Sequence, residues 1–253
     1  MLRPRIIPCL LIHKNGLVKT IKFKDKKYIG DPINTVKIFN EKQVDELMVL
    51  DIDATVEGKA PNYNLIEKLA NESRMPLCYG GGIQSSEQAD KIFSLGIEKI
   101  SISAAAIENP GLVNEISSMV GSQSVVVVLD IKKNLFGRYE IVTHNATIKT
   151  KNKLEDTIND LIERGIGELV INSVDNDGVM KGYDFSLLDR VYGASSVPLT
   201  VLGGAGSVSD IYSVIERYKI VGVAAGSLFV FKGKFKAVLI DYPGNFMQLG
   251  NIK

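Results

Sequence analysis

Short apolar runs recur along the chain and alternate with amphipathic stretches of helical length. Most runs are continuously apolar, which is typical of strands covered on both faces in a parallel sheet. The runs predict eight strands, at residues 6–12, 47–52, 77–79, 100–102, 125–129, 169–171, 199–202 and 221–225. The amphipathic stretches predict seven helices, at residues 32–42, 63–71, 86–94, 110–120, 153–164, 184–192 and 207–217, and a short, weak eighth at 234–241.

The two halves of the sequence resemble each other. Residues 10–14 (LLIHK) correspond to 129–133 (LDIKK), and 80–83 (GGGI) to 203–206 (GGAG), at a period of about 120 positions that suits a duplicated half-domain. A twofold repeat of four strands favours a closed (β/α)8 TIM barrel over an open doubly wound α/β sheet. We therefore expect a single domain over residues 1–253, with half-repeats at about 1–120 and 121–231 and an irregular tail at 242–253.

A net charge of +1 in 253 residues gives no overall attraction to nucleic acid or membrane. The lysines between positions 19 and 27 form one local basic cluster, either a mobile lid over a phosphorylated ligand or a solvated charged loop. Cys9 and Cys78 lie in apolar runs and indicate buried thiols in a reducing compartment. No apolar run is long enough to span a bilayer, and His13 and His144 are too few for a metal site. We expect a soluble, cytoplasmic protein without a metal or cofactor.

Glycine-rich segments follow two of the predicted strands at repeat-equivalent places. In a (β/α)8 barrel the active site is built from the loops that follow the strands. Glycine lets the backbone approach an anion, and the next helix presents free N–H groups to it. The two segments therefore indicate a ligand with two phosphates, although glycines also serve tight turns alone. The candidate ligand residues are Lys19, Asp51, Gly81, Gly82, Ser103, Asp177, Gly178, Gly204, Gly226 and Ser227.

Asp130 ends a predicted strand of four valines and a leucine, so its carboxylate should point into the barrel mouth. Partial burial there suits proton transfer, whereas a carboxylate at a strand end can also simply form a turn. The equivalent position in the first half is Leu11, which can neither donate nor accept a proton. An acid–base pair built on the repeat has therefore lost one member. The other carboxylates at strand ends, which could substitute, are Asp51, Asp53, Asp175 and Asp177.

Four charged residues stand at the opposite ends of the strands. Arg5, Glu46, Lys99 and Glu168 each open an apolar run. Any one of them alone would be an ordinary surface charge. Together, two cations and two anions could form a salt-bridged ring that closes the bottom of the barrel.

These features together resemble the cyclase subunit of imidazole glycerol phosphate synthase, a (β/α)8 barrel, from Arg5 to about Phe231. The resemblance implies a glutaminase partner on the N-terminal face of the barrel, ammonia passing along the barrel axis, and a bisphosphorylated ribulosyl substrate at the mouth. It also implies that the four charged residues form an ammonia gate. The matching segments are residues 5–10 (RIIPCL), 30–32 (GDP), 45–47 (DEL), 80–83, 108–110 (ENP), 121–123 (GSQ), 177–178 (DG), 182–184 (GYD) and 203–206.

The sequence departs from that family's pattern at three places. The two acid–base aspartates correspond to Leu11 and Asp130, the Asn-Thr or Asn-Ser after the fourth strand reads Ser103-Ala104, and the terminal helix is replaced. This combination resembles a divergent branch associated with acetamidino modification of surface polysaccharide sugars, where ammonia passes to a separate sugar amidotransferase. The competing hypothesis is an authentic cyclase of histidine biosynthesis, with Asp51 or Asp177 covering for the lost acid. A sugar-phosphate isomerase of the sister family, which needs no glutaminase, is a third.

Overall fold

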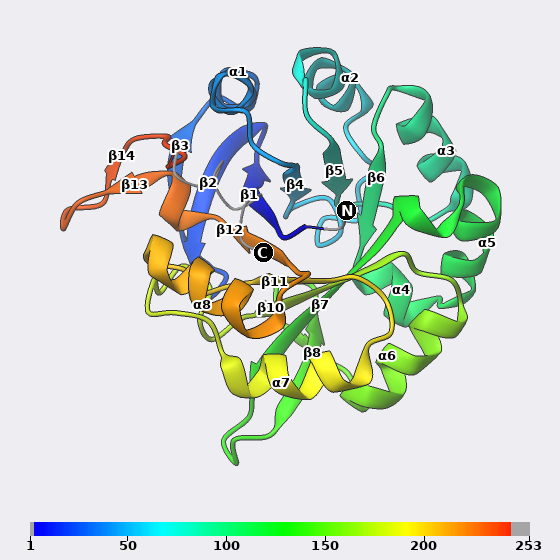
Figure 1. Cartoon of the computed structure of the whole chain (residues 1–253). Coiled ribbons are helices and arrows are strands. Elements are labelled where there is room, and N and C mark those ends of the chain that lie inside the picture. Colours follow the sequence, from blue (N-terminus) through cyan, green and yellow to red (C-terminus); the bar gives the residue numbers. More distant parts are fainter. Residues whose placement is uncertain (1–2, 244–253) are drawn as a thin grey trace.

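Eight parallel strands form a closed ring at the centre of the computed structural model, which describes residues 3–243 (Figure 1). Hydrogen bonds between β7 and β10 close the ring. The (β/α)8 TIM barrel predicted from the sequence is therefore confirmed. The barrel strands are β1 (Arg5–His13), β4 (Leu47–Asp51), β5 (Leu77–Gly80), β6 (Lys99–Ile102), β7 (Val125–Lys133), β10 (Glu168–Ser173), β11 (Leu199–Leu202) and β12 (Gly222–Ala225).

Helices surround the barrel, and their ends follow the capping residues of the sequence (Figure 1). The Asp31 side chain accepts the backbone N–H of Asn34 at 2.8 Å, and Pro32 occupies the first helical position of α1. All seven predicted helices are present, and α4 is an addition. Within residues 3–243, no helix is both long and apolar enough to cross a membrane. The helices are α1 (Pro32–Lys42), α2 (Tyr63–Glu72), α3 (Ser86–Ser94), α4 (Ala104–Glu108), α5 (Gly111–Val120), α6 (Leu154–Glu163), α7 (Phe185–Ala194) and α8 (Val208–Tyr218).

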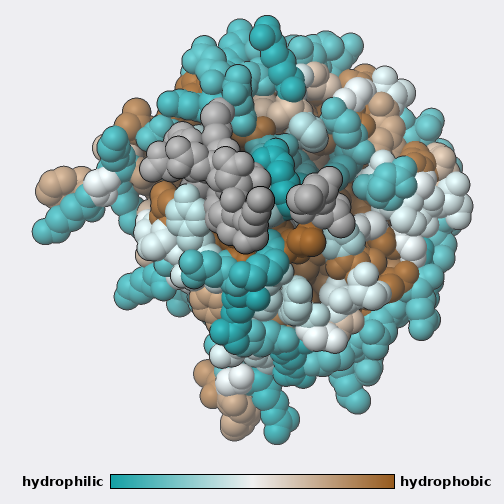
Figure 2. Space-filling model, in the orientation of Figure 1, coloured by the Kyte–Doolittle hydropathy of each residue, from teal (hydrophilic) through white to brown (hydrophobic). Residues whose placement is uncertain are grey.

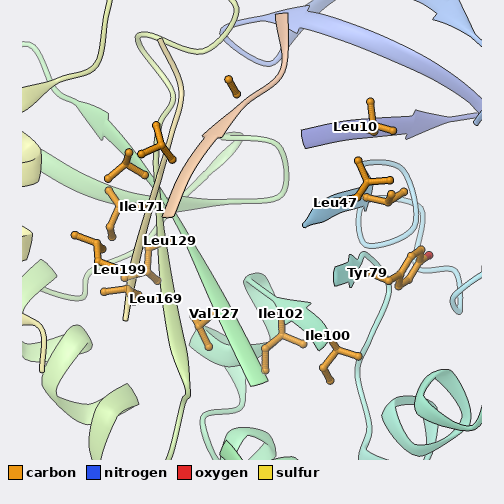
Figure 3. Packing of buried hydrophobic residues seen from close by; sticks show 14 of the residues in the cluster. Leu10, Leu47, Tyr79, Ile100, Ile102, Val127, Leu129, Leu169, Ile171 and Leu199 are labelled. Atoms are coloured by element: carbon orange, nitrogen blue, oxygen red, sulfur yellow. The ribbon is translucent and has the colours of Figure 1, made fainter. Parts of the chain in front are cut away.

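Alternate side chains of the barrel strands enter two separate apolar clusters. Outward-pointing residues such as Leu10, Tyr79, Val127 and Ile171 are buried in the main core between strands and helices (Figure 3). Inward-pointing residues fill the barrel itself. The second cluster consists of Ile7, Cys9, Met48, Cys78, Val126, Val128, Val170, Leu202 and Ala224. Both cysteines are thus buried free thiols, as expected.

The lysine-rich segment after β1 is a β-hairpin, which was not predicted from the sequence. It consists of β2 (Gly16–Ile21) and β3 (Lys24–Gly30), which extend β1 above the barrel. Its turn residues, Lys22 and Phe23, both have positive φ, as a two-residue turn between twisted strands requires. Lys19 points inward and is only 5% exposed, so a purely solvated loop is the wrong interpretation for this lysine.

The second half of the barrel repeats this arrangement. There, β8 (Tyr139–Thr143) and β9 (Ile148–Lys149) extend β7 as antiparallel strands. Leu11 is paired with Val18 of β2, and Asp130 is paired with Val142 of β8. The structure therefore places Leu11 and Asp130 at corresponding points of the two half-barrels.

The short helix predicted at residues 234–241 is absent, so that prediction was wrong. The chain forms a single turn, η2 (Ser227–Phe229), and then a small hairpin of β13 (Phe231–Lys232) and β14 (Ala237–Val238). Gly233, at φ +72°, takes the chain out of any helical path. Of the tail predicted at 242–253, Tyr242 is buried beside Phe229, with ring centroids 5.3 Å apart, and residues 244–253 lie outside the described part of the chain.

Candidate functional site

A cavity of about 440 Å³ opens at the carboxyl ends of the barrel strands, where active sites of this fold lie. Leu11 and Asp130 both line it. Most of the predicted ligand residues are brought together there although they come from six different segments of the chain. These are Lys19, Asp51, Gly81, Gly82, Ser103, Asp177, Gly226 and Ser227.

Two of the predicted ligand residues are not among those that line this cavity. Gly178 has a φ of +67°, and a Cβ added to it would overlap the carbonyl oxygen of Thr20. Gly204 has a φ of +127°, and a Cβ there would overlap the carbonyl oxygen of Gly182. Both glycines therefore permit close backbone packing around the mouth, and neither has a surface facing the cavity.

Asp130 is a partly buried carboxyl group held by one neighbouring side chain. Asn172 Nδ2 donates a hydrogen bond to Asp130 Oδ1 at 2.9 Å. Burial raises the pKa of Asp130 to about 7, the hydrogen bond from Asn172 lowers it, and the negative charge of Asp177 raises it. A carboxyl with such a pKa can release and take up a proton near neutral pH.

The strand register gives the two halves of the mouth opposite chemistry. Asp130 on β7 is paired with Asn172 on β10, whereas Leu11 on β1 is paired with Leu50 on β4. Leu11 and Leu50 both pack against the apolar cluster inside the barrel. Position 11, where the repeat would place a second carboxylate, therefore lies in an apolar neighbourhood. It has no polar neighbour equivalent to Asn172.

Asp51 is the nearest carboxylate to this apolar side along the strand register. It follows Leu50 directly, and its Oδ1 accepts the backbone N–H groups of Asp53 at 2.9 Å and Ala54 at 3.1 Å. Burial raises its pKa, and these two hydrogen bonds oppose that shift. Asp51 thus faces the cavity while it also closes the turn after β4.

Asp177 follows β10, the strand paired with β7, and contacts the hairpin that extends β1. Thr20 Oγ1 donates to its Oδ2 at 3.1 Å. Burial raises the pKa of Asp177, and the nearby Lys19 ammonium opposes this. The other two strand-end aspartates do not line the cavity. Asp53 contacts His13, and Asp175 accepts the backbone N–H of residue 133 at 2.7 Å.

Lys19 places a cation deep in the mouth. Its Nζ donates to the carbonyl oxygen of Cys9, and a Cβ at position 226 would overlap this Nζ, so the glycine there makes room for the ammonium group. Burial lowers the pKa of Lys19, and the charge of Asp177 opposes the shift. Asp177 therefore interacts electrostatically both with Lys19, on the hairpin that extends β1, and with Asp130 on β7.

The two glycine loops differ in how open they are to an anion. Gly81 and Gly82 have φ values of +116° and +74° and line the cavity. In the second half, the carboxylate of Asp210 accepts the backbone N–H groups of Gly206 and Ser207, each at 2.9 Å. In the first loop, Gly82 N–H likewise donates to Thr55 Oγ1 at 3.3 Å and Gln84 N–H to Gln88 Oε1 at 2.7 Å. Both loops therefore have backbone donors already bound by side chains, and the first loop differs in that its glycines line the cavity.

At the bottom of the barrel, the four predicted charges form a closed ring. Arg5 binds Glu46 and Glu168, the latter at 2.8 Å, and Lys99 Nζ lies 3.0 Å from Glu46 and 2.9 Å from Glu168. Although burial acts in the opposite direction, these cations lower the pKa of Glu168. The apolar cluster lies between this ring and the cavity floor. The barrel axis is therefore charged at one end, apolar in the middle and polar at the other end.

Asn172 is a functional candidate that was not predicted from the sequence. The residue follows the apolar run 169–171 directly, and counting alternate positions back to Glu168 would have placed it inside the barrel. Its Oδ1 is buried and has no hydrogen-bond partner within residues 3–243. In the same part of the chain, no group of three or more His, Cys, Asp or Glu side chains is arranged to hold a metal ion.

The fold and this site define a (β/α)8-barrel protein with buried ionisable side chains at its mouth and a ring of charges at its opposite end. The profile of the family described as "Histidine biosynthesis protein" matches residues 5–236, and the chain belongs to this family.

Three relatives illustrate two levels of identity. A protein of Leptospira borgpetersenii named "Putative imidazole glycerol phosphate synthase subunit HisF" is 57% identical over 244 residues, 96% of each chain. One of Pseudomonas aeruginosa named "Putative imidazole glycerol phosphate synthase subunit hisF2" is 50% identical over 243 residues, 96% of this chain and 97% of its own. "Imidazole glycerol phosphate synthase subunit HisF" of Natranaerobius thermophilus is 35% identical over 232 residues, 92% of each chain.

Proposed function

We propose that this chain is the cyclase-like barrel subunit of a glutamine amidotransferase complex. A glutaminase subunit docks on the N-terminal face, beside the ring of Arg5, Glu46, Lys99 and Glu168, and releases ammonia into the barrel. The ammonia reaches the mouth and passes to a sugar amidotransferase. That enzyme converts an N-acetyl group to an acetamidino group on a sugar of lipopolysaccharide, a cytoplasmic step of O-antigen synthesis.

The strand pairing at the mouth carries this proposal. Leu11 is paired with Leu50, whereas Asp130, at the corresponding point of the other half, is paired with Asn172. Ring closure needs a proton taken up at one centre and given up at another, and the position that corresponds to Asp130 in the other half is a leucine packed against the apolar cluster. The ring of charges is nevertheless complete, and the interior above it carries no charge. A neutral molecule such as ammonia crosses an apolar interior at far lower cost than an ion does.

The competing function is imidazole ring closure in histidine biosynthesis. It is favoured by the family itself and by the relatives named as imidazole glycerol phosphate synthase subunits at 34–36% identity. In that case Asp51 would replace the lost acid, since its carboxylate faces the cavity and its pKa is raised by burial. The relatives at 50–58% identity carry the same subunit name preceded by "Putative", so their names do not favour the first proposal.

An ammonia-dependent cyclase assay separates the two functions. The purified barrel is incubated with an ammonium salt and the bisphosphorylated ribulosyl substrate, beside the variants Leu11→Asp and Leu11→Asn. We expect negligible turnover from the unmodified chain and partial turnover from Leu11→Asp only, because the amide of Leu11→Asn cannot carry the proton. Rapid turnover by the unmodified protein, abolished by Asp51→Asn, would establish the cyclase function.

The docking of a glutaminase is tested separately. Pull-down with the glutaminase encoded in the same organism should recover a complex, and reversal of charge by Glu46→Lys should weaken it while the mouth residues stay unchanged. If no glutaminase binds, the sugar-phosphate isomerase hypothesis gains support and ammonia transfer is refuted.

A further inference from the structure

Two segments far apart in the sequence form one surface beside the mouth. Residues 21–30 belong to the β2–β3 hairpin, and residues 231–240 form the β13–β14 hairpin and its exit (Figure 1). Lys27 Nζ donates to the carbonyl oxygen of Lys236 at 2.9 Å and lies 4.9 Å from the ring centroid of Phe231. We call the joint surface of these twenty residues the lysine surface.

The lysine surface is strongly cationic although the chain as a whole is nearly neutral. It holds seven lysines and a single carboxylate, Asp25. Lys26 pairs with Asp53 at 3.3 Å, and within residues 3–243 no other lysine of this surface has a carboxylate oxygen within 4.0 Å. Because the net charge of the chain is +1, the remainder is net negative, and the molecule is electrically polarised. The seven lysines are Lys22, Lys24, Lys26, Lys27, Lys232, Lys234 and Lys236.

Exposed apolar side chains lie among these lysines. Phe235 stands at the tip of the β13–β14 hairpin between Lys234 and Lys236 and is 90% exposed, and Tyr28 is 65% exposed. Figure 2 shows hydrophobic and hydrophilic side chains side by side on the tip that projects at the left. Large apolar groups held in water on a projecting element are typical of a contact surface. The other exposed apolar members are Ile21, Val238 and Leu239.

We propose that the lysine surface binds the headgroup region of an anionic phospholipid bilayer and holds the barrel on it as a peripheral protein. Lysines that attract anionic headgroups, mixed with aromatic and aliphatic side chains that enter the interface, are the combination that lipid surfaces select. The twenty residues contain no arginine. Protein and nucleic-acid interfaces favour arginine for its paired hydrogen bonds, and lysine is depleted at protein interfaces.

This inference does not depend on the proposed function, and it departs from the expectation that the net charge gave. The net charge averages a basic surface with an acidic remainder, whereas a bilayer responds only to the charges within about 10 Å of it. Phe23 of the same hairpin lines the cavity. Binding would therefore hold the barrel mouth close to the lipid surface.

Co-sedimentation of the full chain with vesicles tests the proposal. Vesicles of phosphatidylglycerol and phosphatidylcholine in equal amounts should bind the protein at about 0.05 M salt and release it at about 0.5 M, because added ions screen the lysines. Vesicles of phosphatidylcholine alone should not bind it. The triple variant Lys232→Gln, Lys234→Gln, Lys236→Gln should bind on the order of 100-fold more weakly, and Phe235→Ser about tenfold more weakly.

Matched variants on other parts of the surface serve as controls. Lys149→Gln, Lys151→Gln, Lys153→Gln removes the same charge from another exposed segment, and Phe136→Ser removes another exposed aromatic ring, one that is 87% exposed. Both controls should bind vesicles as the unmodified protein does. Equal losses in the two lysine triples would show that only total charge matters and would overturn the proposal. So would absence of binding to the anionic vesicles, or binding to a single-stranded oligonucleotide with the same dependence on Phe235.

Discussion

Replacement of Asp130 by asparagine should stabilise the protein at alkaline pH, by an amount that follows from the environment of this carboxyl group. Burial raises its pKa from 3.8 to about 7. Between these two pH values the unfolded chain has already lost the proton that the native state keeps, so native stability falls as the pH rises. Asparagine cannot ionise and escapes this loss.

The magnitude follows from the pKa shift. Each unit is worth about 1.4 kcal/mol, so the full shift corresponds to about 4 kcal/mol. Measurements that begin at pH 5.5 capture only the loss of stability between pH 5.5 and 7, which is about 2 kcal/mol. Because Asp130 borders an open cavity, access of solvent should reduce the effect, and we expect about 1 to 2 kcal/mol, or a change in melting temperature of about 4 °C.

Thermal unfolding of Asp130→Asn and of the unmodified protein at pH 5.5 and 8.5 measures this effect. The variant should gain stability relative to the parent as the pH rises. Asp184→Asn is the matched control, because a hydrogen bond from Lys133 keeps the pKa of Asp184 low in spite of its partial burial. Both pH values lie above that pKa, so its loss of stability should be the same at each. If the difference in stability between Asp130→Asn and the unmodified protein is the same at pH 5.5 and at pH 8.5, the reasoning is refuted.

Three further predictions address the ring, the first glycine loop and the mouth. Glu168→Gln should lower the free energy of unfolding by about 3 to 5 kcal/mol in urea titrations, because it leaves two partly buried cations underpaired; a loss below about 1 kcal/mol would contradict the ring. Gly81→Ala, at φ +116°, places its new Cβ against a backbone carbonyl, whereas Gly137→Ala, at φ +76°, places one in open space. Gly81→Ala should therefore lower the melting temperature clearly more than Gly137→Ala does. Equal decreases would count against the close packing of this loop. Asn172→Leu should raise the pKa of Asp130 in carboxyl carbon NMR titrations, since it removes a hydrogen bond to the ionised form; an unchanged pKa would disprove that role.

The strands and helices of the barrel could be predicted from the sequence because they depend on neighbouring residues. Continuous apolar runs identified the eight barrel strands, and capping residues such as Asp31 and Pro32 marked a helix start. The extensions above the barrel were harder. The turn of the β2–β3 hairpin consists of Lys22 and Phe23, whereas such turns usually contain asparagine, aspartate or glycine. The hairpin is instead held in place by its pairing to β1.

The candidate site shows a similar division. The placement of Asp130 at the mouth followed from its position at the end of an apolar run, and the loss at Leu11 followed from the internal repeat. The sequence did not show that Leu50 and Asn172 are the neighbours of these two residues, because register between strands depends on the whole closed ring. Nor did it show that Lys19 is buried beside Gly226.

The sequence by itself determined the alternation of strands and helices, the twofold repeat and the types of charge at the two ends of the strands, since these are properties of neighbouring residues. Only the tertiary structure decided which charges meet in the ring, that Leu11 is paired with Leu50, and that lysines near position 25 and position 235 share one surface. The physical reason is that burial and electrostatic interaction depend on distance in space. Barrel closure brings together groups that the chain keeps far apart.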